Sequence, residues 1–496
     1  MNRRNLLILM SDQHSRDAMG CAGHPVVRTP NLDKLAARGT RFTSAYTPCP
    51  ICVPARASFA TGQYVHQIGY WDNAHPYEGR IESWGHQLIA AGHRVESIGK
   101  LHHRFDEDPD GYAQHHIPLN VVDGIGDVMS SLREDIPVRS SNREAIKSAS
   151  GGESTYLDYD RRIADSAEDW LTDAAGRKSD GDDKPWAAFV SFVCPHPPYI
   201  CPPDLFDEYF NHPNLPMPPQ WRRDDWPDHP ALNEFRRVMQ CDEPFTEEEI
   251  RRVTAAYFGA TTWMDRQLGR VIDSLEANGL TQDTRIIYTS DHGESLGRRG
   301  LFGKFTMYEE SAGVPLILAG PDVPEGKVCQ TPANLIDVRQ SALDCLGVEP
   351  AESDVNRPGK SLFQIANESD DMDRVAFSEY HAVASTSAQF MLRKGDHKLI
   401  HYTGQNPQLF DLKTDPDEVN DLADNAESKP VLQDLKAELR KIVSPEEIDA
   451  KAKTDQAALI EKNGGRDAVL AKGTFINSPA PGEKPAFVNS DPAESK

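Results

Sequence analysis

The stretch Asn5-Leu-Leu-Ile-Leu-Met-Ser-Asp12-Gln13 decides the fold class. Its apolar run is long enough for one strand and carries no polar residue, which is typical of a strand that is buried on both faces of a parallel sheet. The run ends at Asp12, and ligands bind at the carboxyl ends of the strands in such sheets. The sequence therefore predicts a buried first strand with Asp12 at the functional edge of the sheet.

Apolar runs and helical patterns alternate after this strand. The predicted strands are Arg94–Ile98, Trp186–Val193, Thr284–Thr289 and Val314–Ala319, and the predicted helices are Asn31–Arg38, Ile81–Ala91, Tyr156–Ala175, Thr246–Ala277 and Asn334–Leu346. This order predicts an α/β fold with a mainly parallel sheet flanked by helices. Asp291 follows one of these strands, so we expect Asp12 and Asp291 to lie on one edge.

The pattern changes after about residue 375. Three short strands are predicted at Gln389–Leu392, His397–Thr403 and Gln408–Asp411, followed by a helix near Pro430–Val443. We therefore predict a catalytic domain at 1–374, a smaller C-terminal α+β subdomain at 375–445 and an extension at 446–496. From Ser478 onward Pro, Ala, Ser and Glu dominate, which predicts a tail or an extended arm.

Composition narrows the classes of function. The 496 residues include 38% hydrophobic and 26% charged residues, and the formal net charge is −24. Such an acidic chain lacks the positive surface that binds nucleic acid or an anionic membrane, and no run approaches the roughly 20 apolar residues of a membrane span. The first apolar run is also short for a signal peptide, and the eight cysteines are scattered. These features predict a cytoplasmic protein with mostly reduced cysteines.

The segment Cys49-Pro-Ile-Cys52-Val-Pro-Ala-Arg56-Ala-Ser58-Phe-Ala-Thr61-Gly62 carries the most chemical information. Read as C-x-x-C, it is compatible with a redox site or with half of a zinc site. A redox motif needs a helix that begins at its first cysteine, and a zinc site needs a second pair at similar spacing, which the sequence lacks. The more specific pattern is C-x-P-x-R followed by A-S-x-x-T-G.

This pattern resembles the signature of the sulfatase family in the alkaline-phosphatase superfamily. Further segments resemble other motifs of that family in the same order, namely Gly92–His102, Ser191–Tyr199, Thr289–Glu294 and Leu409–Glu418. The resemblance implies an alkaline-phosphatase-like fold over most of the chain. The pairs Asp12-Gln13 and Asp291-His292 are similar to the branch that contains choline sulfatases and phosphonate monoester hydrolases.

The resemblance implies one divalent metal ion. Its ligands would be Asp12, Gln13, Asp291 and His292, together with an oxygen derived from Cys52. Oxygen-rich donor sets with a single imidazole suit hard cations better than thiophilic metals. The ion is expected to be Ca²⁺ or Mn²⁺.

The resemblance also implies that a formylglycine-generating maturation enzyme oxidises Cys52 to formylglycine (3-oxoalanine). One hydroxyl of the aldehyde hydrate would attack sulfur and expel the alcohol, which leaves a covalent sulfo-enzyme. The second hydroxyl would then reform the aldehyde and release sulfate. In the same family pattern Arg56 orients the hydrate.

Five further residues acquire roles only through the resemblance. Lys100 and Lys304 would bind the sulfate oxygens, and His102 would exchange the proton of the hydrate. His196 would assist the leaving oxygen, and Asn73 would contact the substrate. Outside such motifs, a lone lysine is usually a solvated charge and Asp72-Asn73 is usually a turn.

The leading hypothesis is therefore a sulfatase that hydrolyses a sulfate monoester to an alcohol and inorganic sulfate. The alternative within the superfamily is a phosphonate monoester or phosphodiester hydrolase. Lys100 and His102 favour the sulfatase, because the phosphonate enzymes of the family carry Tyr and Thr at these positions. A hypothesis of another class is a redox protein that uses Cys49 and Cys52.

The sequence leaves the alcohol open among aryl, choline and carbohydrate sulfates. We expect the pocket to be walled by residues 70–77, 103–118 and 201–242. Tyr70, Trp71, Trp221 and Trp226 in these segments could surround a quaternary ammonium, but four aromatic residues in two loops are more often packing residues. Residues 451–481 resemble the extension of choline-sulfatase-like enzymes, which contributes to oligomer contacts. We accordingly predict a homodimer or homotetramer.

Overall fold

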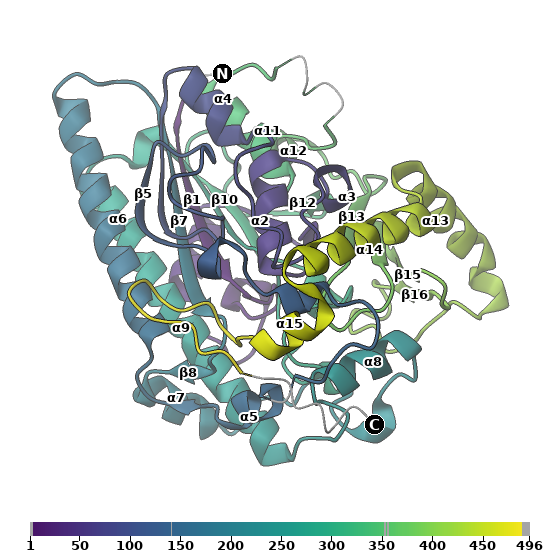
Figure 1. The fold of residues 1–496 in the computed structure, drawn as a ribbon. Helices are drawn as coiled ribbons and strands as arrows, with labels where there is room; N and C mark the ends of the chain where they lie inside the picture. The colour runs from purple at the N-terminus through teal and green to yellow at the C-terminus, as the bar shows by residue number, and fades with distance from the viewer. Residues whose placement is uncertain (1–2, 140, 352–353, 355–356, 489–496) are drawn as a thin grey trace.

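The structure, a computed structural model, describes residues 3–139, 141–351, 354 and 357–488 (Figure 1). At its centre lies an eight-stranded sheet with the order β11-β2-β10-β9-β1-β7-β4-β5. The run from β9 to β5 is parallel, whereas β10 is antiparallel to both of its neighbours. The strands are β1 (Asn5–Asp12), β2 (Gly39–Phe42), β4 (Arg94–Lys100), β5 (Gln114–Leu119), β7 (Trp186–Pro195), β9 (Thr284–Ser290), β10 (Leu316–Ala319) and β11 (Lys327–Cys329).

Helices cover both faces of this sheet, as β1 illustrates. Leu7 and Leu9 point to a core formed with α1 (Pro30–Ala37), α6 (Thr155–Ser179) and α9 (Glu247–Ala277). Leu6 and Ile8 point the other way, to a core that includes residues of α2 (Cys52–Thr61), α4 (Trp84–Ala90), α11 (Asp337–Leu346) and α12 (Leu362–Asn367). All four leucine and isoleucine side chains are fully buried. The predicted mainly parallel α/β fold is confirmed.

Shorter elements complete this part of the chain. The helices are α3 (Val65–Ile68), α5 (Asn142–Lys147), α7 (Pro203–Phe210), α8 (Pro230–Val238) and α10 (Glu309–Ala312), and the short strands are β3 (Ala45–Tyr46), β6 (Ser150–Gly151), β8 (Ile200–Cys201) and β12 (Ala333–Asn334). Among the described helices, none combines the length and the apolar character that a membrane crossing requires.

A second, antiparallel sheet follows in the order β13-β14-β15-β16. Its strands are β13 (Ala376–Tyr380), β14 (Gln389–Lys394), β15 (His397–Tyr402) and β16 (Gln408–Asp411). Helix α13 (Lys429–Ile442) packs on this sheet through a shared apolar cluster that includes Leu399, Leu409 and Leu435. The predicted small C-terminal α+β subdomain is confirmed, and β13 is an additional strand.

A buried cluster of charges joins the small antiparallel sheet to the main body. Glu309 of α10 accepts hydrogen bonds from Lys398 Nζ (2.8 Å), Arg16 Nη2 (2.6 Å) and the Tyr46 hydroxyl (3.0 Å). Lys398 also lies 2.8 Å from Glu418. Because Lys398 belongs to β15 and Tyr46 to β3, the cluster fixes the small sheet to the main body.

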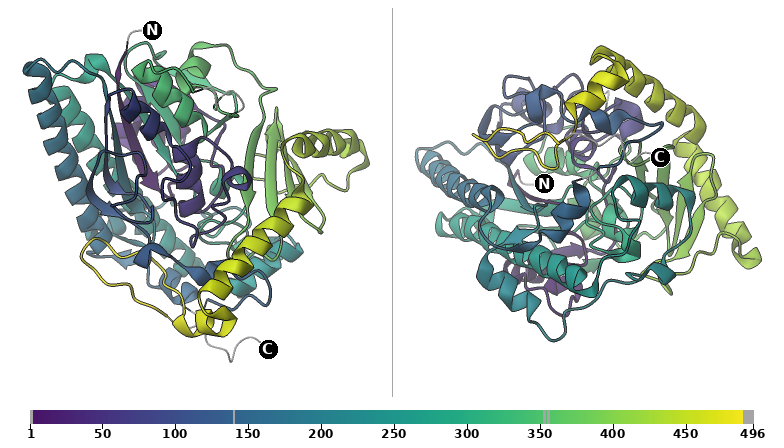
Figure 2. Two further views of the ribbon diagram at one scale, coloured as in Figure 1. Left: turned by 45° about the horizontal axis from the view of Figure 1, so that its top comes forward. Right: turned by 60° about the horizontal axis from the view of Figure 1, so that its bottom comes forward.

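The extension continues as two helices, α14 (Pro445–Lys462) and α15 (Gly465–Lys472). Gln456 of α14 is fully buried, and its Nε2 donates to Asp72 Oδ2 (2.8 Å) and to the His381 carbonyl (2.6 Å). Trp71 Nε1 donates to Asp455 Oδ2 over 2.9 Å. Figure 2 shows α14 and the yellow segment beyond it lying against the main body. The extension therefore supports a turn of the first domain.

Glu96 provides a test of how strand β4 is stabilised. Burial alone would raise the pKa of this carboxyl, but hydrogen bonds from His116, Arg94 and Trp170 outweigh burial and lower its pKa to about 2. Between pH 4.5 and pH 2, Glu96 is protonated in the unfolded chain but still ionised in the folded protein. The unfolded state is therefore stabilised by proton binding, and stability falls as the pH falls through this range. Glu96→Gln should remove about 1–2 kcal/mol of this dependence, as measured by urea unfolding between pH 3 and pH 6.

The exposed Glu134 supplies the matched control. Glu134→Gln should leave the pH dependence of the unfolding free energy unchanged. If the unfolding free energy of Glu96→Gln and that of the unaltered protein changed equally with pH, the hydrogen bonds to Glu96 would not stabilise its ionised form.

Candidate active site

The candidate site lies where parallel strands of the main sheet end. Asp12 is the last residue of β1, Asp291 directly follows β9, and Lys100 is the last residue of β4. Residues Ser11 and Ser290 pair directly, which places the two aspartates side by side. The sequence-based expectation that both carboxylates share one edge is thus met in the structure.

Arg56 lies between these two carboxylates. Its Nε donates to Asp291 Oδ2 (2.9 Å), and its Nη2 donates to Asp12 Oδ2 (3.2 Å). Nη1 donates to the Lys100 carbonyl (2.8 Å) and to Ser191 Oγ (3.0 Å). The Arg56 side chain is 2% exposed, and these contacts tie α2 to strands β1, β4 and β7 and to the residue that follows β9.

Cys52 is the first residue of α2, one helical turn before Arg56. Its Sγ lies 3.1 Å from His292 Nε2, 3.0 Å from Lys304 Nζ and 3.8 Å from Asp12 Oδ1. Burial first, and then the negative charge of Asp12, raise the pKa of the thiol to about 11. The unmodified side chain is therefore a neutral thiol at neutral pH.

The four side chains Asp12, Cys52, Asp291 and His292 form a potential metal site. One atom from each lies within 4.8 Å of the others, and all four are buried. Burial and then the charge of Asp12 raise the pKa of Asp291 to about 6, and a divalent cation between the two carboxylates would relieve this repulsion. Burial and then Lys304 lower the pKa of His292, which keeps its ring in the neutral form that binds metals. This donor set fits a hard divalent cation once an oxygen replaces the thiol.

Gln13 and Lys304 complete this side of the site. Gln13 has a positive φ of 65°, and its Oε1 accepts a hydrogen bond from Lys304 Nζ over 2.9 Å. Its Nε2 donates to Glu294, which also accepts from the Tyr199 hydroxyl (3.0 Å) and from the Gly303 amide (2.7 Å). Glu294 thus fixes which end of the Gln13 amide faces the site. Sequence reasoning assigned Glu294 no role, although it lies inside the Thr289–Glu294 motif.

Lys100, His102 and His196 come from the opposite side. Lys100 Nζ lies 2.7 Å from Asp12 Oδ2 and is fully buried, whereas His196 Nε2 lies 4.0 Å from Asp12 Oδ1. Neither ring nitrogen of His102 has a hydrogen-bond partner among the described residues. Burial, and then Lys100 for His102 and Lys304 for His196, lower the pKa of both imidazoles.

Asn73 contacts the start of α2. Its Oδ1 accepts a hydrogen bond from the Val53 amide over 3.2 Å, which satisfies one free amide of the helix terminus. The residue also lines the cavity beside Cys52. The carboxylate of Asp72 holds this turn by accepting from Ser131 Oγ (2.7 Å) and Gln456 Nε2 (2.8 Å).

The cavity beside Cys52 has a volume of about 140 Å³. Gln13, Asn73, His102, His196 and Lys304 line it, and residues 474–478 of the extension form part of its wall.

The expectation about the pocket walls was wrong for one segment. Of the predicted wall segments, 70–77 and 201–242 contribute Asn73 and Met239, but none of residues 103–118 lines the cavity. Tyr70, Trp71, Trp221 and Trp226 do not line the cavity, which agrees with the packing alternative. Tyr70 and Trp71 are buried.

The redox hypothesis does not fit the local geometry. Helix α2 begins at Cys52 rather than at Cys49, and Cys49 is fully buried. Burial first raises the pKa of the Cys49 thiol well above its ordinary value, which opposes the thiolate that disulfide exchange requires. All eight cysteines are free.

Comparison with known proteins identifies the family. The sequence pattern of the Sulfatase family matches residues 4–348. The chain belongs to the sulfatase family. A second pattern, N-sulphoglucosamine sulphohydrolase, C-terminal, matches residues 297–444 of the sulfatase.

Individual relatives agree with this membership. The sulfatase is 32% identical to choline-sulfatase of Rhizobium meliloti, over 85% of this chain and 82% of the relative. It is 29% identical to arylsulfatase K of Danio rerio, over 89% and 84% of the two chains. Its fold is similar to that of the phosphonate monoester hydrolase of Agrobacterium radiobacter, with a TM-score of 0.69 and 22% identity over 91% and 96% of the two chains. The protein is thus a member of a family of sulfuric ester hydrolases.

The buried guanidinium of Arg56 yields a prediction about stability. Arg56→Ala leaves Asp12 and Asp291 without the cation that lies between them, and breaking a buried ion pair costs about 3–5 kcal/mol. The variant should unfold at correspondingly lower urea concentration, as followed by circular dichroism. Arg161→Ala removes a surface pair with Asp158 and should change stability by less than about 0.5 kcal/mol. A loss below about 1 kcal/mol for Arg56→Ala would contradict this account.

Proposed function

We propose that the protein is a formylglycine-dependent sulfatase, which hydrolyses a sulfate monoester to an alcohol and inorganic sulfate. The observation that carries the proposal is the position of Cys52 Sγ, which lies within 3.1 Å of both His292 Nε2 and Lys304 Nζ at the start of α2. An oxygen nucleophile formed at this position would face the metal ligands and the substrate cavity together.

The proposed metal ion is held by Asp12, Gln13, Asp291, His292 and the modified Cys52. When bound, the ion supplies positive charge that polarises the sulfate group and favours ionisation of the nucleophile. His292 presents Nε2 to the site because its Nδ1 is 3.1 Å from the Gly293 carbonyl. The oxygen-rich donor set supports Ca²⁺ and leaves Mn²⁺ as the alternative.

The charged side chains of the chain bind the sulfate group in this proposal. Lys304 Nζ lines the cavity and is aimed at the position of Cys52, so it binds a sulfate oxygen and stabilises charge that develops during cleavage. Lys100 holds Asp12 Oδ2 at 2.7 Å and does not line the cavity. Its positive charge therefore attracts the sulfate group through space rather than by lining the cavity.

Each of the two histidines transfers a proton to or from a different reacting group in this proposal. His196 shares a 2.7 Å hydrogen bond between Nδ1 and the Pro197 carbonyl, so its neutral ring carries the proton on Nδ1. Nε2 is then the atom that takes up a proton and returns it to the leaving oxygen. His102 exchanges a proton with the nucleophile, and its lowered pKa keeps it able to accept one at neutral pH.

Phosphonate monoester hydrolysis is the second candidate. The fold similarity to a phosphonate monoester hydrolase supports it, whereas the charged pair Lys100 and His102 supports sulfate. Parallel assays with phenyl sulfate and with a phenyl phosphonate monoester decide between them through the ratio of kcat/KM.

Conversion of Cys52 is the first prediction of this proposal. In protein from a host that matures a known sulfatase, the tryptic fragment Phe42–Arg56 should be about 18 Da lighter than the unmodified peptide, as measured by mass spectrometry. Cys52→Ala should lose about 10³-fold or more of the sulfatase activity because the nucleophile is absent.

The neighbouring cysteine provides the control. Cys49→Ala removes a buried thiol that contacts no substrate and should retain both the mass change and the activity. A peptide that carries only thiols, or a Cys49–Cys52 disulfide, would contradict the proposal and favour the redox hypothesis.

Metal removal is the second prediction. Chelation should abolish activity and lower Tm, because a ligand present at about 100 times its Kd stabilises the folded state by about 2.7 kcal/mol. Adding Ca²⁺ or Mn²⁺ separately should restore both quantities and identify the ion. Asp291→Asn lacks one ligand, so its Tm should respond little to either ion. An unchanged Tm on chelation and re-addition of both ions would exclude the metal site.

The remaining proposals concern the protein as a whole. We propose a cytoplasmic location, which the eight free cysteines support, and maturation by a formylglycine-generating enzyme. We also propose domain boundaries at 374/375 and 445/446 and a homodimer or homotetramer in solution. Light scattering that gives a mass near the 55.1 kDa of one chain would exclude the oligomer.

A further inference from the structure

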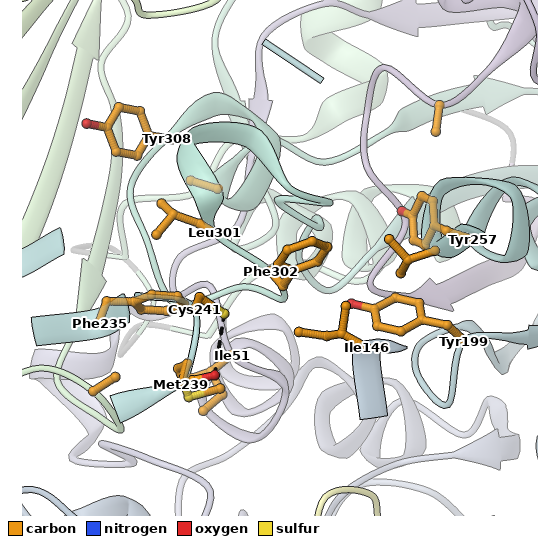
Figure 3. Packing of buried hydrophobic residues seen from close by; sticks show 14 of the residues in the cluster. Ile51, Ile146, Tyr199, Phe235, Met239, Cys241, Tyr257, Leu301, Phe302 and Tyr308 are labelled. Carbon is orange, nitrogen blue, oxygen red and sulfur yellow. Dashed lines mark hydrogen bonds between the residues drawn. The ribbon is translucent and has the colours of Figure 1, made fainter. Parts of the chain in front are cut away.

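The cavity beside Cys52 is small and mostly apolar. Its volume of about 140 Å³ resembles that of a protein cavity of ~150 Å³ that binds benzene. Figure 3 shows apolar side chains that also line the cavity, packed as one cluster. They are Ile51, Ile146, Tyr199, Met239 and Phe302. The space therefore suits one ring beside Cys52.

Asp127 is one of the polar residues in this wall. The residue is 8% exposed, and its Oδ2 accepts hydrogen bonds from Ser130 Oγ (2.6 Å) and Arg139 Nη1 (2.8 Å). Its Oδ1 is buried and has no hydrogen-bond partner among the described residues. A buried carboxylate oxygen without a donor is costly, and such groups in native proteins call for an explanation.

We propose that Asp127 Oδ1 accepts a hydrogen bond from a hydroxyl on the alcohol part of the substrate. The preferred substrate is then the monosulfate of a compact, uncharged ring alcohol that carries a second hydroxyl. This inference rests on the proposed sulfatase function, since Asp127 and Cys52 line the same cavity.

The charges of the wall favour an uncharged leaving group. Arg139 lies 2.8 Å from Asp127, so their charges largely cancel. Lys304 and the two histidines of the site also line the cavity. Among the described lining residues, no other aspartate, glutamate, lysine, arginine or histidine is present. A polysulfated sugar would find no further cation there, and an ammonium group would meet Arg139 beside the carboxylate.

Residues 474–478 keep this wall in place. Arg139 Nη1 donates to Thr474 Oγ1 (2.5 Å), and the Tyr156 hydroxyl donates to the Ser478 carbonyl (2.5 Å). Tyr156 in turn packs beside His196, with ring centroids 6.0 Å apart. The extension thus limits the size of the cavity while it holds Arg139 against Asp127.

Matched aryl sulfates test the inference. Phenyl sulfate, the 2-, 3- and 4-hydroxyphenyl sulfates and their methoxy analogues differ in whether they carry a donor. We expect kcat/KM for the best hydroxyphenyl isomer to exceed that for phenyl sulfate and for its methoxy analogue by about tenfold. Choline sulfate and a disulfated glucosamine should be poorer substrates than phenyl sulfate.

Two variants at Asp127 sharpen the test. In Asp127→Ala, kcat/KM for the best hydroxyphenyl sulfate should become about equal to kcat/KM for phenyl sulfate, and phenyl sulfate should still be hydrolysed. In Asp127→Asn the amide oxygen takes the place of Oδ2, so its NH₂ group faces the substrate and should remove the preference for hydroxyl over methoxy. Asp123→Asn, at an exposed position on the same segment, should preserve the preference.

The outcomes separate this inference from the proposed function. Absence of the Cys52 mass change overturns the proposed function and this inference with it. A converted enzyme that shows equal kcat/KM for hydroxyphenyl and phenyl sulfates overturns only the role of Asp127. A converted enzyme that prefers choline sulfate or the disulfated sugar overturns the substrate class.

Discussion

The guanidinium of Arg56 is the contact on which the rest of the site depends. Two fully buried carboxylates, Asp12 and Asp291, lie side by side at the ends of adjacent strands, and their mutual repulsion is large in a water-poor environment. Arg56 hydrogen-bonds both of them and also reaches the Lys100 carbonyl and Ser191. Because Cys52 lies one turn earlier on the same helix, the contacts that neutralise the carboxylates also position the side chain that we propose as the precursor of the nucleophile.

The sequence could predict the part of this arrangement that depends on local pattern. Each predicted strand of the parallel run exists, and two of them place Asp12 and Asp291 on one edge, since parallel strands end together. The direction of a strand in the sheet was harder to predict from the sequence. The run at Val314–Ala319 is short and uniformly apolar, and β10 is antiparallel, so the pattern carried no information about its orientation.

The walls of the cavity could not be predicted, because they depend on contacts between distant residues. Asp127, Met239 and Thr474 lie on three separate segments, and no spacing in the sequence connects them. Trp71 shows a choice that the sequence left open. The residue could have contacted the substrate or packed, and the structure shows packing, because its indole donates to Asp455 of α14 and is fully buried. Glu294 lay within a motif, yet its role in holding Gln13 appears only from the geometry.

The position of the extension has a consequence for synthesis on the ribosome. The proposed metal ligands and Lys304 lie between residues 12 and 304, whereas the cavity wall at Thr474 follows 170 residues later. At roughly 5–20 residues per second, the later segment emerges about 10–30 s after the ligands. During that interval the N-terminal part of the nascent chain already contains Cys52 but lacks the segment 474–478 that forms part of the cavity wall. The order of synthesis thus leaves a period in which the proposed maturation enzyme could reach a cysteine that is 1% exposed in the finished fold.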